Sequence, residues 1–141
     1  HFVGVYSCDR LPILKKRHFS LVVNTETHEK SGEHWQAIVY KRGVCHFFCS
    51  LGQKPNNYIS VYLQGFKKVV RNKAAPQNNN EYTCGGYCVF VISMMSRSND
   101  FASVCQFFDL VKSDDKFIRY FLQEGYKYRI ETPPNHFHIL R

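Results

Sequence analysis

Long apolar runs are missing from this sequence. No stretch is long enough to cross a bilayer, which takes about 18 residues, so we expect no transmembrane helix and no membrane partner. No N-terminal signal pattern is visible either, and a chain that begins at His1 rather than Met is expected to be a fragment without its targeting signals. With 44% hydrophobic residues the chain is too apolar for intrinsic disorder. Its 141 residues suit a single domain spanning 1–141.

Cysteine is too sparse for a disulfide scaffold. The 6 cysteines among 141 residues fall below the roughly 8% typical of such chains. A zinc site is a second interpretation, but the two close pairs have three rather than two intervening residues (Cys45–Cys49 and Cys84–Cys88). The third interpretation, which we favour, requires no metal and no cofactor. It makes one cysteine a nucleophile and the others small buried hydrophobic residues in a reducing environment.

Acidic residues are absent from the stretch 41–80, which carries a large share of the positive charge of the chain. The chain has 19 Lys and Arg against 11 Asp and Glu, a formal net charge of +8. Such a stretch attracts polyanions, and without a base-reading motif any DNA binding would be nonspecific and salt-dependent. A solvated basic face is an equally compatible interpretation. The residues expected to contact nucleic acid are Lys67, Lys68, Arg71 and Lys73.

The hydrophobic pattern predicts an α+β fold. Strands are expected at 19–23, 34–40, 44–49 and 67–70. The segment 2–6 fits a short strand or an irregular entry segment, and the segment 58–66 fits either a helix or a strand. Helices are expected at 84–95, 103–111 and 113–123, with Ser103 and Ser113 as N-caps, before a tail of strand or coil. We therefore predict a small, mostly antiparallel sheet packed on a central buried helix that starts at Cys84, with flanking helices.

Cys84 has the sequence surroundings of a nucleophile. It follows the polar loop 72–82 and begins the apolar run 84–95, with Gly85 and Gly86 directly after it. The positive end of a helix dipole favours the reactive thiolate at such a position. Neighbouring glycines leave backbone N–H groups accessible, as an oxyanion hole requires.

A cysteine nucleophile needs a general base, and the chain has 7 histidines. His34 is the best placed of them because it ends a glycine-containing loop and begins a predicted strand. A structural histidine is the alternative at this position, and the residues alone leave that alternative open.

Three motifs follow one another along the chain. They are Gly32-x-His34-Trp35, then Phe48-x-Ser-Leu-Gly52, then Gln77 seven residues before Cys84-Gly85. Together with the N-terminal segments 2–6, 10–12 and 23–25, they resemble the adenovirus endopeptidase (adenain) family. These viral cysteine proteases are related in fold to the proteases that remove ubiquitin-like proteins.

The resemblance implies a role for each residue. Cys84 would attack the scissile carbonyl, and His34 would accept the thiol proton and later protonate the leaving amine. Gln77 would donate its side-chain amide to the oxyanion, and Trp35 would pack under the site or simply in the core. The implied function is cleavage of viral precursor (capsid or core) proteins at Gly-containing sites, in the virion and the host cell nucleus.

Cys49 occupies the position at which the family has an acidic or amide residue that orients the imidazole. A neutral thiol is a weak hydrogen-bond acceptor, so three explanations stay open. The enzyme works as a Cys–His pair beside Cys49, or Ser50 or Asn56 orients His34, or the chain is poorly active. We expect a working enzyme.

Family members are stimulated by DNA and by a capsid-derived peptide disulfide-linked to a cysteine upstream of the glutamine. No cysteine lies between Cys49 and Cys84, so a noncovalent peptide is the expected form of this partner. Protein substrates and a monomeric state are also expected. Two other functions stay open, a protease that removes ubiquitin-like proteins and a nonenzymatic relic that binds nucleic acid or capsid.

Overall fold

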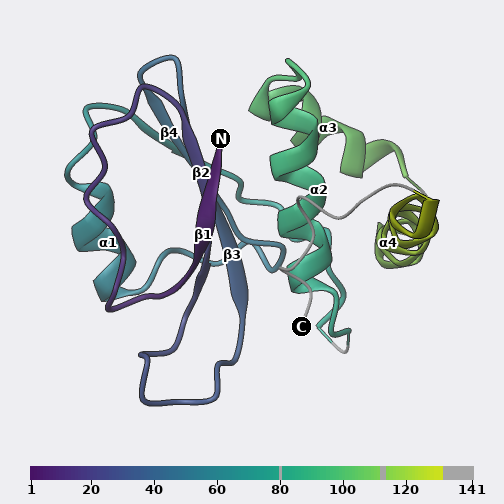
Figure 1. Cartoon of the computed structure of the whole chain (residues 1–141), viewed down its shortest axis with the longest axis horizontal. Coiled ribbons are helices and arrows are strands. Elements are labelled where there is room, and N and C mark those ends of the chain that lie inside the picture. The colour runs from purple at the N-terminus through teal and green to yellow at the C-terminus, as the bar shows by residue number, and fades with distance from the viewer. Residues whose placement is uncertain (80, 112–113, 132–141) are drawn as a thin grey trace.

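In the computed structural model, a five-stranded sheet has helices on both of its faces. The structure describes residues 1–79, 81–111 and 114–131. The strands lie in sequence order: β1 (Phe2–Ser7), β2 (Phe19–Asn24), β3 (Trp35–Lys41), β4 (Val44–Phe48) and β5 (Val69–Arg71). Helix α1 (Asn57–Leu63) lies on one side (Figure 1). Helices α2 (Cys84–Ser96), α3 (Phe101–Leu110) and α4 (Asp114–Glu131) lie on the other side. The α+β class predicted from the sequence is confirmed.

The sheet is mixed rather than mostly antiparallel. Strands β2–β3 and β3–β4 pair antiparallel, as the turn at Arg42 and Gly43 predicts for the second pair. Strands β1–β2 and β4–β5 pair parallel. Parallel neighbours need a connection that returns along the sheet. The segment 8–18 provides it for the first pair, and the segment 49–68, which contains α1, provides it for the second.

Alternation along β3 divides the core in two. Ala37 and Val39 pack with α2, α3 and α4, whereas Ile38 packs on the opposite face with α1. Helix α2 contributes buried residues from every turn, which fits the apolar run that predicted a buried helix. Its C-terminal end is held by Lys41 of β3, whose Nζ donates to the Met95 carbonyl at 2.7 Å.

The structure decides one helix prediction that was open and corrects two others. The ambiguous segment 58–66 is largely helical, because Asn56 caps α1 by accepting a hydrogen bond from the Ile59 N–H. Ser103 is not an N-cap: Asp100 caps α3, and the Ser103 N–H donates to its carboxylate at 2.7 Å. Helix α4 continues to Glu131, beyond the predicted end at 123, and Ser113 and the tail 132–141 lie outside the described residues.

Within the part of the chain that the structure describes, no helix combines the length and hydrophobicity needed to span a membrane.

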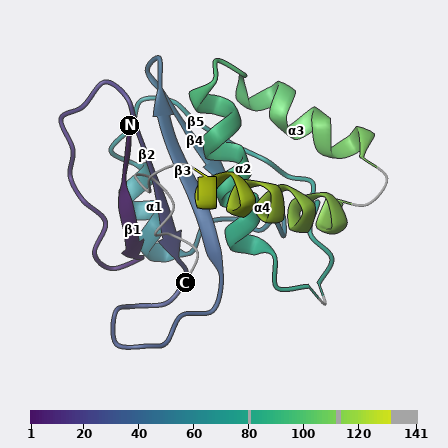
Figure 2. The same cartoon turned by 45° about the vertical axis from the view of Figure 1, so that its right-hand side comes forward.

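Helix α4 runs across α2 in close contact, and a glycine makes this possible (Figure 2). A Cβ atom at Gly86 would lie 2.6 Å from Ile118 Cγ2 and 2.8 Å from Leu122 Cδ1. A Cβ at Gly85 would meet only Trp35 Cδ1, at an ordinary 3.8 Å. The two adjacent glycines therefore differ sharply in the space around them.

We expect Gly86→Ala to lower the free energy of unfolding by about 1–3 kcal/mol, because the methyl group forces α2 and α4 apart. Urea unfolding of the variant measures the effect. Gly85→Ala is the matched control, with an expected change below about 1 kcal/mol. Equal losses for both variants would contradict the close packing at Gly86.

Candidate active site

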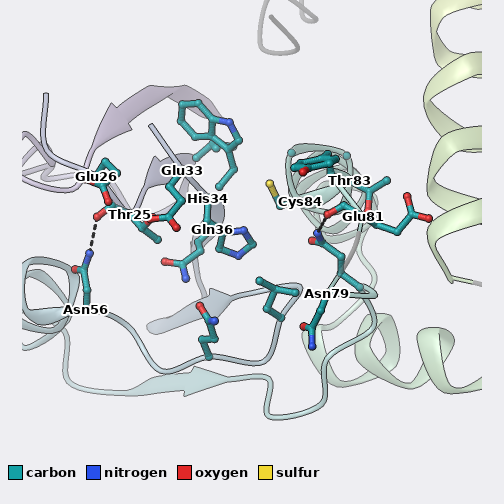
Figure 3. A pocket seen from close by; sticks show the side chains of 18 of the residues that line it. Thr25, Glu26, Glu33, His34, Gln36, Asn56, Asn79, Glu81, Thr83 and Cys84 are labelled. Carbon is teal, nitrogen blue, oxygen red and sulfur yellow. Dashed lines mark hydrogen bonds between the residues drawn. The ribbon is translucent and has the colours of Figure 1, made fainter. Parts of the chain in front are cut away.

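One cavity of about 980 Å³ contains the three residues predicted to carry the chemistry. Cys84 lines it from the start of α2 and His34 from the end of the loop before β3 (Figure 3). Gln77 lines it from the loop before α2. Trp35 and Gly85 also line it. The segments that meet here are separated by about 40 residues of sequence, so the fold and not local spacing assembles the cavity.

Cys84 is the first residue of α2, as its sequence surroundings predict. The N–H groups of the first turn of a helix lack partners within the helix and are available to an anion. Thr83 precedes it without capping the helix through its side chain. Instead, the Thr83 hydroxyl donates to the Asp115 carboxylate at 2.7 Å. The half-buried thiol therefore lies where a developing oxyanion would meet backbone N–H donors.

His34 is buried and hydrogen-bonds to Cys49. Its Nε2 lies 3.3 Å from Cys49 Sγ, and its backbone carbonyl accepts the Thr25 N–H at 2.9 Å. Burial lowers the pKa of His34 below its usual value near 6.5, which favours the neutral form that a general base needs. The described part of the chain shows no hydrogen bond between His34 and the Cys84 thiol. Catalytic hydrogen bonds are often long before substrate binds.

Cys49 is fully buried at the end of β4, beside the imidazole, where the family resemblance expected an acidic or amide residue. The Asn72 side chain fixes its backbone by accepting the Cys49 N–H at 2.9 Å and donating to the Cys49 carbonyl at 2.7 Å. Neither of the two alternative orienting residues bonds to His34 in the described residues. Ser50 Oγ donates to Gln77 Oε1, and Asn56 caps α1 and donates to the Thr25 carbonyl.

Gln77 is buried and held at both ends of its amide. Its Oε1 accepts from Ser50 Oγ at 2.5 Å, its Nε2 donates to the Glu81 carbonyl at 2.6 Å, and its backbone N–H donates to the Ser50 carbonyl. An amide nitrogen carries two hydrogens, so one remains for a substrate oxygen. Ser50 thus bonds to Gln77 rather than to the imidazole.

Asp115, in the first turn of α4, ties the start of α2 to the loop that contains Gln77. Its carboxylate accepts from Thr83 Oγ1 at 2.7 Å, Tyr87 Oη at 3.1 Å and the Asn78 N–H at 2.9 Å. Its contacts cross more than 25 residues of sequence, so no local pattern could have revealed this role.

The other cysteines behave as structural thiols. Burial raises the pKa of Cys45 to about 12 and that of Cys105, which also lies near Asp109, to about 11. Burial likewise raises the pKa of Cys8 and Cys88. Cys45 packs in the core beside α1 and Cys88 in the core beside α2. Cys45 and Cys88, one from each close pair, therefore lie on opposite faces of the sheet, so the four cysteines do not surround one zinc ion.

The predicted nucleic-acid residues lie around β5 at the edge of the sheet. Lys67, Lys68 and Lys73 are exposed, and Arg71 is half-buried with its guanidinium donating to the Asn72 carbonyl. The binding of DNA there stays a prediction.

No protein-family model and no curated protein matches the chain. Two crystal structures of the ASFV pS273R protease, one of them of the Se-Met protein, are similar at 22% sequence identity. Their TM-scores are 0.49 and 0.48, over 63% of this chain. The chain spans 38% and 37% of the length of those two structures. The resemblance to the adenovirus endopeptidase stays a prediction from the motifs.

Proposed function

We propose that this chain is a cysteine endopeptidase of the adenovirus endopeptidase type. The supporting observation is the meeting of Cys84, His34 and Gln77 around one cavity, with Cys84 at a helix N-terminus. We also propose that the substrates are viral precursor proteins with glycine next to the scissile bond, and that the enzyme acts in the virion and the host cell nucleus. DNA and a noncovalently bound capsid-derived peptide are proposed to stimulate the enzyme.

The chemistry follows from the positions of these groups. His34 accepts the proton of Cys84, and the sulfur attacks the scissile carbonyl carbon. The carbonyl oxygen becomes an oxyanion that accepts from the second Nε2 hydrogen of Gln77 and from the N–H of Cys84. The C–N bond breaks as His34 protonates the amine, which leaves a thioester on Cys84. Water then attacks the thioester with His34 again as base, and free Cys84 and the carboxylate product form.

An aromatic side chain borders the cavity beside Cys84. Trp35 lies directly beside the start of α2, since a Cβ at Gly85 would be 3.8 Å from its ring. A bulky aromatic side chain next to the nucleophile would disfavour large side chains adjacent to the scissile bond, which supports the proposed preference for glycine.

A thiol-directed probe and a peptide panel test the function. We expect the probe, mapped by mass spectrometry, to label Cys84 faster than the comparably half-buried Cys105. Glycine-rich peptides from capsid or core precursors should be cleaved. Cleavage of ubiquitin-like fusions alone would identify a deconjugating protease instead. Equal labelling of both cysteines together with no cleavage would favour a nonenzymatic binding module.

Burial of neutral His34 also predicts a pH dependence of stability. The unfolded chain takes up a proton near pH 6.5 and the folded chain only at lower pH, so acidification favours the unfolded state. We expect the free energy of unfolding to fall from pH 7 to pH 5, and to fall less in His34→Gln. Urea titrations at several pH values measure this. Identical slopes for both proteins would contradict it. The other titratable residues lining the cavity, which both proteins share, are Glu26, Glu33, Lys54, Glu81, Tyr82, Cys84 and Arg119.

A further inference from the structure

Asn24, the last residue of β2, closes the loop that leads to His34. Its side chain is buried, with 5% of the residue exposed. Its Oδ1 accepts two backbone N–H groups from opposite ends of the loop 25–33, that of Glu26 at 2.8 Å and that of Glu33 at 3.2 Å. One side-chain oxygen therefore joins the two ends of this loop.

The backbone pairing at the same place reaches His34 directly. Strands β2 and β3 pair antiparallel, and Asn24 lies opposite Trp35 at the end of the register. One residue further, the Thr25 N–H donates to the His34 carbonyl at 2.9 Å. Glu33, whose N–H bonds to Asn24, directly precedes His34. The backbone on both sides of this contact is thus bonded to Asn24 or adjacent to it.

Gly32 packs against the same amide. It has a φ of +92°, and a Cβ atom there would lie 2.8 Å from Asn24 Nδ2 and 3.2 Å from Asn24 Cγ. Side chains rarely adopt this φ, and a Cβ essentially never comes so close to another heavy atom. The glycine of the Gly32-x-His34-Trp35 motif is therefore required by its contact with Asn24.

We propose that Asn24 is a positioning residue: its Oδ1, with Gly32 packed against the amide, fixes the backbone that holds His34 across the cavity from Cys84 (Figure 3). This inference rests on the proposed peptidase function, in which His34 is the general base. A displacement of about 1 Å in such a group can cost on the order of 100-fold in rate. Cys49 contacts the ring of His34, whereas Asn24 acts on its backbone.

The two halves of the Asn24 amide differ, and this difference makes the role testable. Nδ2 is buried and donates to no described residue, although an unpaired buried donor costs about 1–3 kcal/mol. A carboxylate lacks that donor, and it accepts N–H bonds more strongly than an amide oxygen does. The two N–H groups would meet its charge. If the position requires Oδ1, aspartate should replace asparagine here and alanine should not.

Direct substrate binding by Asn24 is the weaker alternative. Its neighbours Thr25 and Glu26 line the cavity, but Asn24 is not among the described residues that do. Its unpaired Nδ2 is enclosed, with Gly32 packed against it. A substrate group could reach this nitrogen only by displacing Gly32, so Asn24 acts through the backbone.

Kinetics of matched variants test the proposal. Asn24→Ala, measured well below its melting temperature, should lower kcat by about 10-fold or more, because the backbone before His34 is released. Asn24→Asp should retain most of the parent kcat, because both N–H groups keep their acceptor. Asn99→Ala is the control with unchanged kcat. It also removes a side-chain bond to the backbone, to the Met94 carbonyl at 3.0 Å, but at the opposite end of α2 from Cys84.

Amide hydrogen exchange separates this inference from the proposed function. In Cys84→Ala protein, NMR measures the protection of the Thr25 N–H, which donates to the His34 carbonyl, without any turnover. Adding Asn24→Ala should lower this protection by about 10-fold or more, and adding Asn24→Asp should retain it. The protection of the Val22 N–H, in the middle of β2, corrects for any change in global stability.

Gly32→Ala keeps the proposal testable if Asn24→Ala does not fold. Its methyl group pushes the amide of Asn24 aside without removing any of its atoms. It should lower both kcat and the protection of the Thr25 N–H, as Asn24→Ala does.

Failure of the inference and failure of the proposed function give different results. Unchanged Thr25 protection in Asn24→Ala or Gly32→Ala would overturn the positioning role even if the enzyme cleaves peptides. So would a parent-like kcat in Asn24→Ala, or a kcat in Asn24→Asp as low as in Asn24→Ala. Absence of cleavage by the parent protein would overturn the proposed function, while the exchange rates would still decide whether Asn24 holds the backbone of His34.

Discussion

Replacing Cys84 by alanine should abolish peptide cleavage and leave the fold intact. The variant removes the atom that forms the thioester, and among the described residues no other cysteine lines the cavity to replace it. Removing the nucleophile of a hydrolase commonly costs on the order of 10⁴-fold or more in kcat. We expect residual cleavage below about 10⁻⁴ of the parent rate in steady-state assays.

The melting temperature of Cys84→Ala shows whether a loss of activity comes from the missing thiol or from unfolding. Cys84 is only half-buried, and alanine favours the helix, so the melting temperature should change by no more than a few degrees. Cys105→Ala is the matched control, because it removes another half-buried thiol from a helix on the same side of the sheet. It should keep full activity. Comparable loss in both variants, or activity retained in Cys84→Ala, would contradict a nucleophilic role for Cys84.

Two residues that line the candidate site could be predicted because they carry local signals. Cys84 follows a polar loop and starts an apolar run, and His34 precedes a strand, so each was recognisable within a short window of sequence. Their supporting residues carry no such signal. Asn72 and Asp115 act through contacts 23 or more residues away along the chain, and only the fold shows them.

Strand positions were readable from hydrophobic pattern, but strand directions were not. The apolar residues of β1 and β5 look the same whether their neighbours run parallel or antiparallel. Direction depends on how the connections return, and the connection to β5 contains α1, in a segment that fitted a helix or a strand equally well. The mostly antiparallel sheet was therefore half right, with the β2–β3–β4 centre as predicted.

Asp115 is expected to give the second large effect. It lies in the first turn of α4 with 9% of its surface exposed, and three donors from the nucleophile side converge on it. Oδ1 accepts from Thr83 and Tyr87, and Oδ2 accepts from the Asn78 N–H, one residue after Gln77. One carboxylate thus connects α4 with the start of α2 and with the oxyanion loop.

Asp115→Ala should lower the free energy of unfolding by roughly 3 kcal/mol or more, because it leaves these donors without their acceptor. Asp115→Asn should disturb only the contact with the Asn78 N–H. Its amide oxygen can still accept from Thr83 and Tyr87, but its NH₂ group would face the Asn78 N–H, donor against donor. We expect kcat to fall by about 10-fold or more with a smaller loss of stability, because the loop that holds the oxyanion donor is released.

Asp114, the residue before Asp115, provides the matched control. Burial, with the negative charges of Asp115 and Asp109, raises the pKa of Asp114 to about 6, and its Oδ1 has no hydrogen-bond partner among the described residues. Asp114→Asn removes that unfavourable charge, so stability at pH 7 should be equal or higher, with kcat unchanged. Urea unfolding and steady-state kinetics on the variants measure both quantities. If Asp115→Asn and Asp114→Asn had the same kcat, the Asp115 carboxylate would stabilise the fold without positioning Gln77.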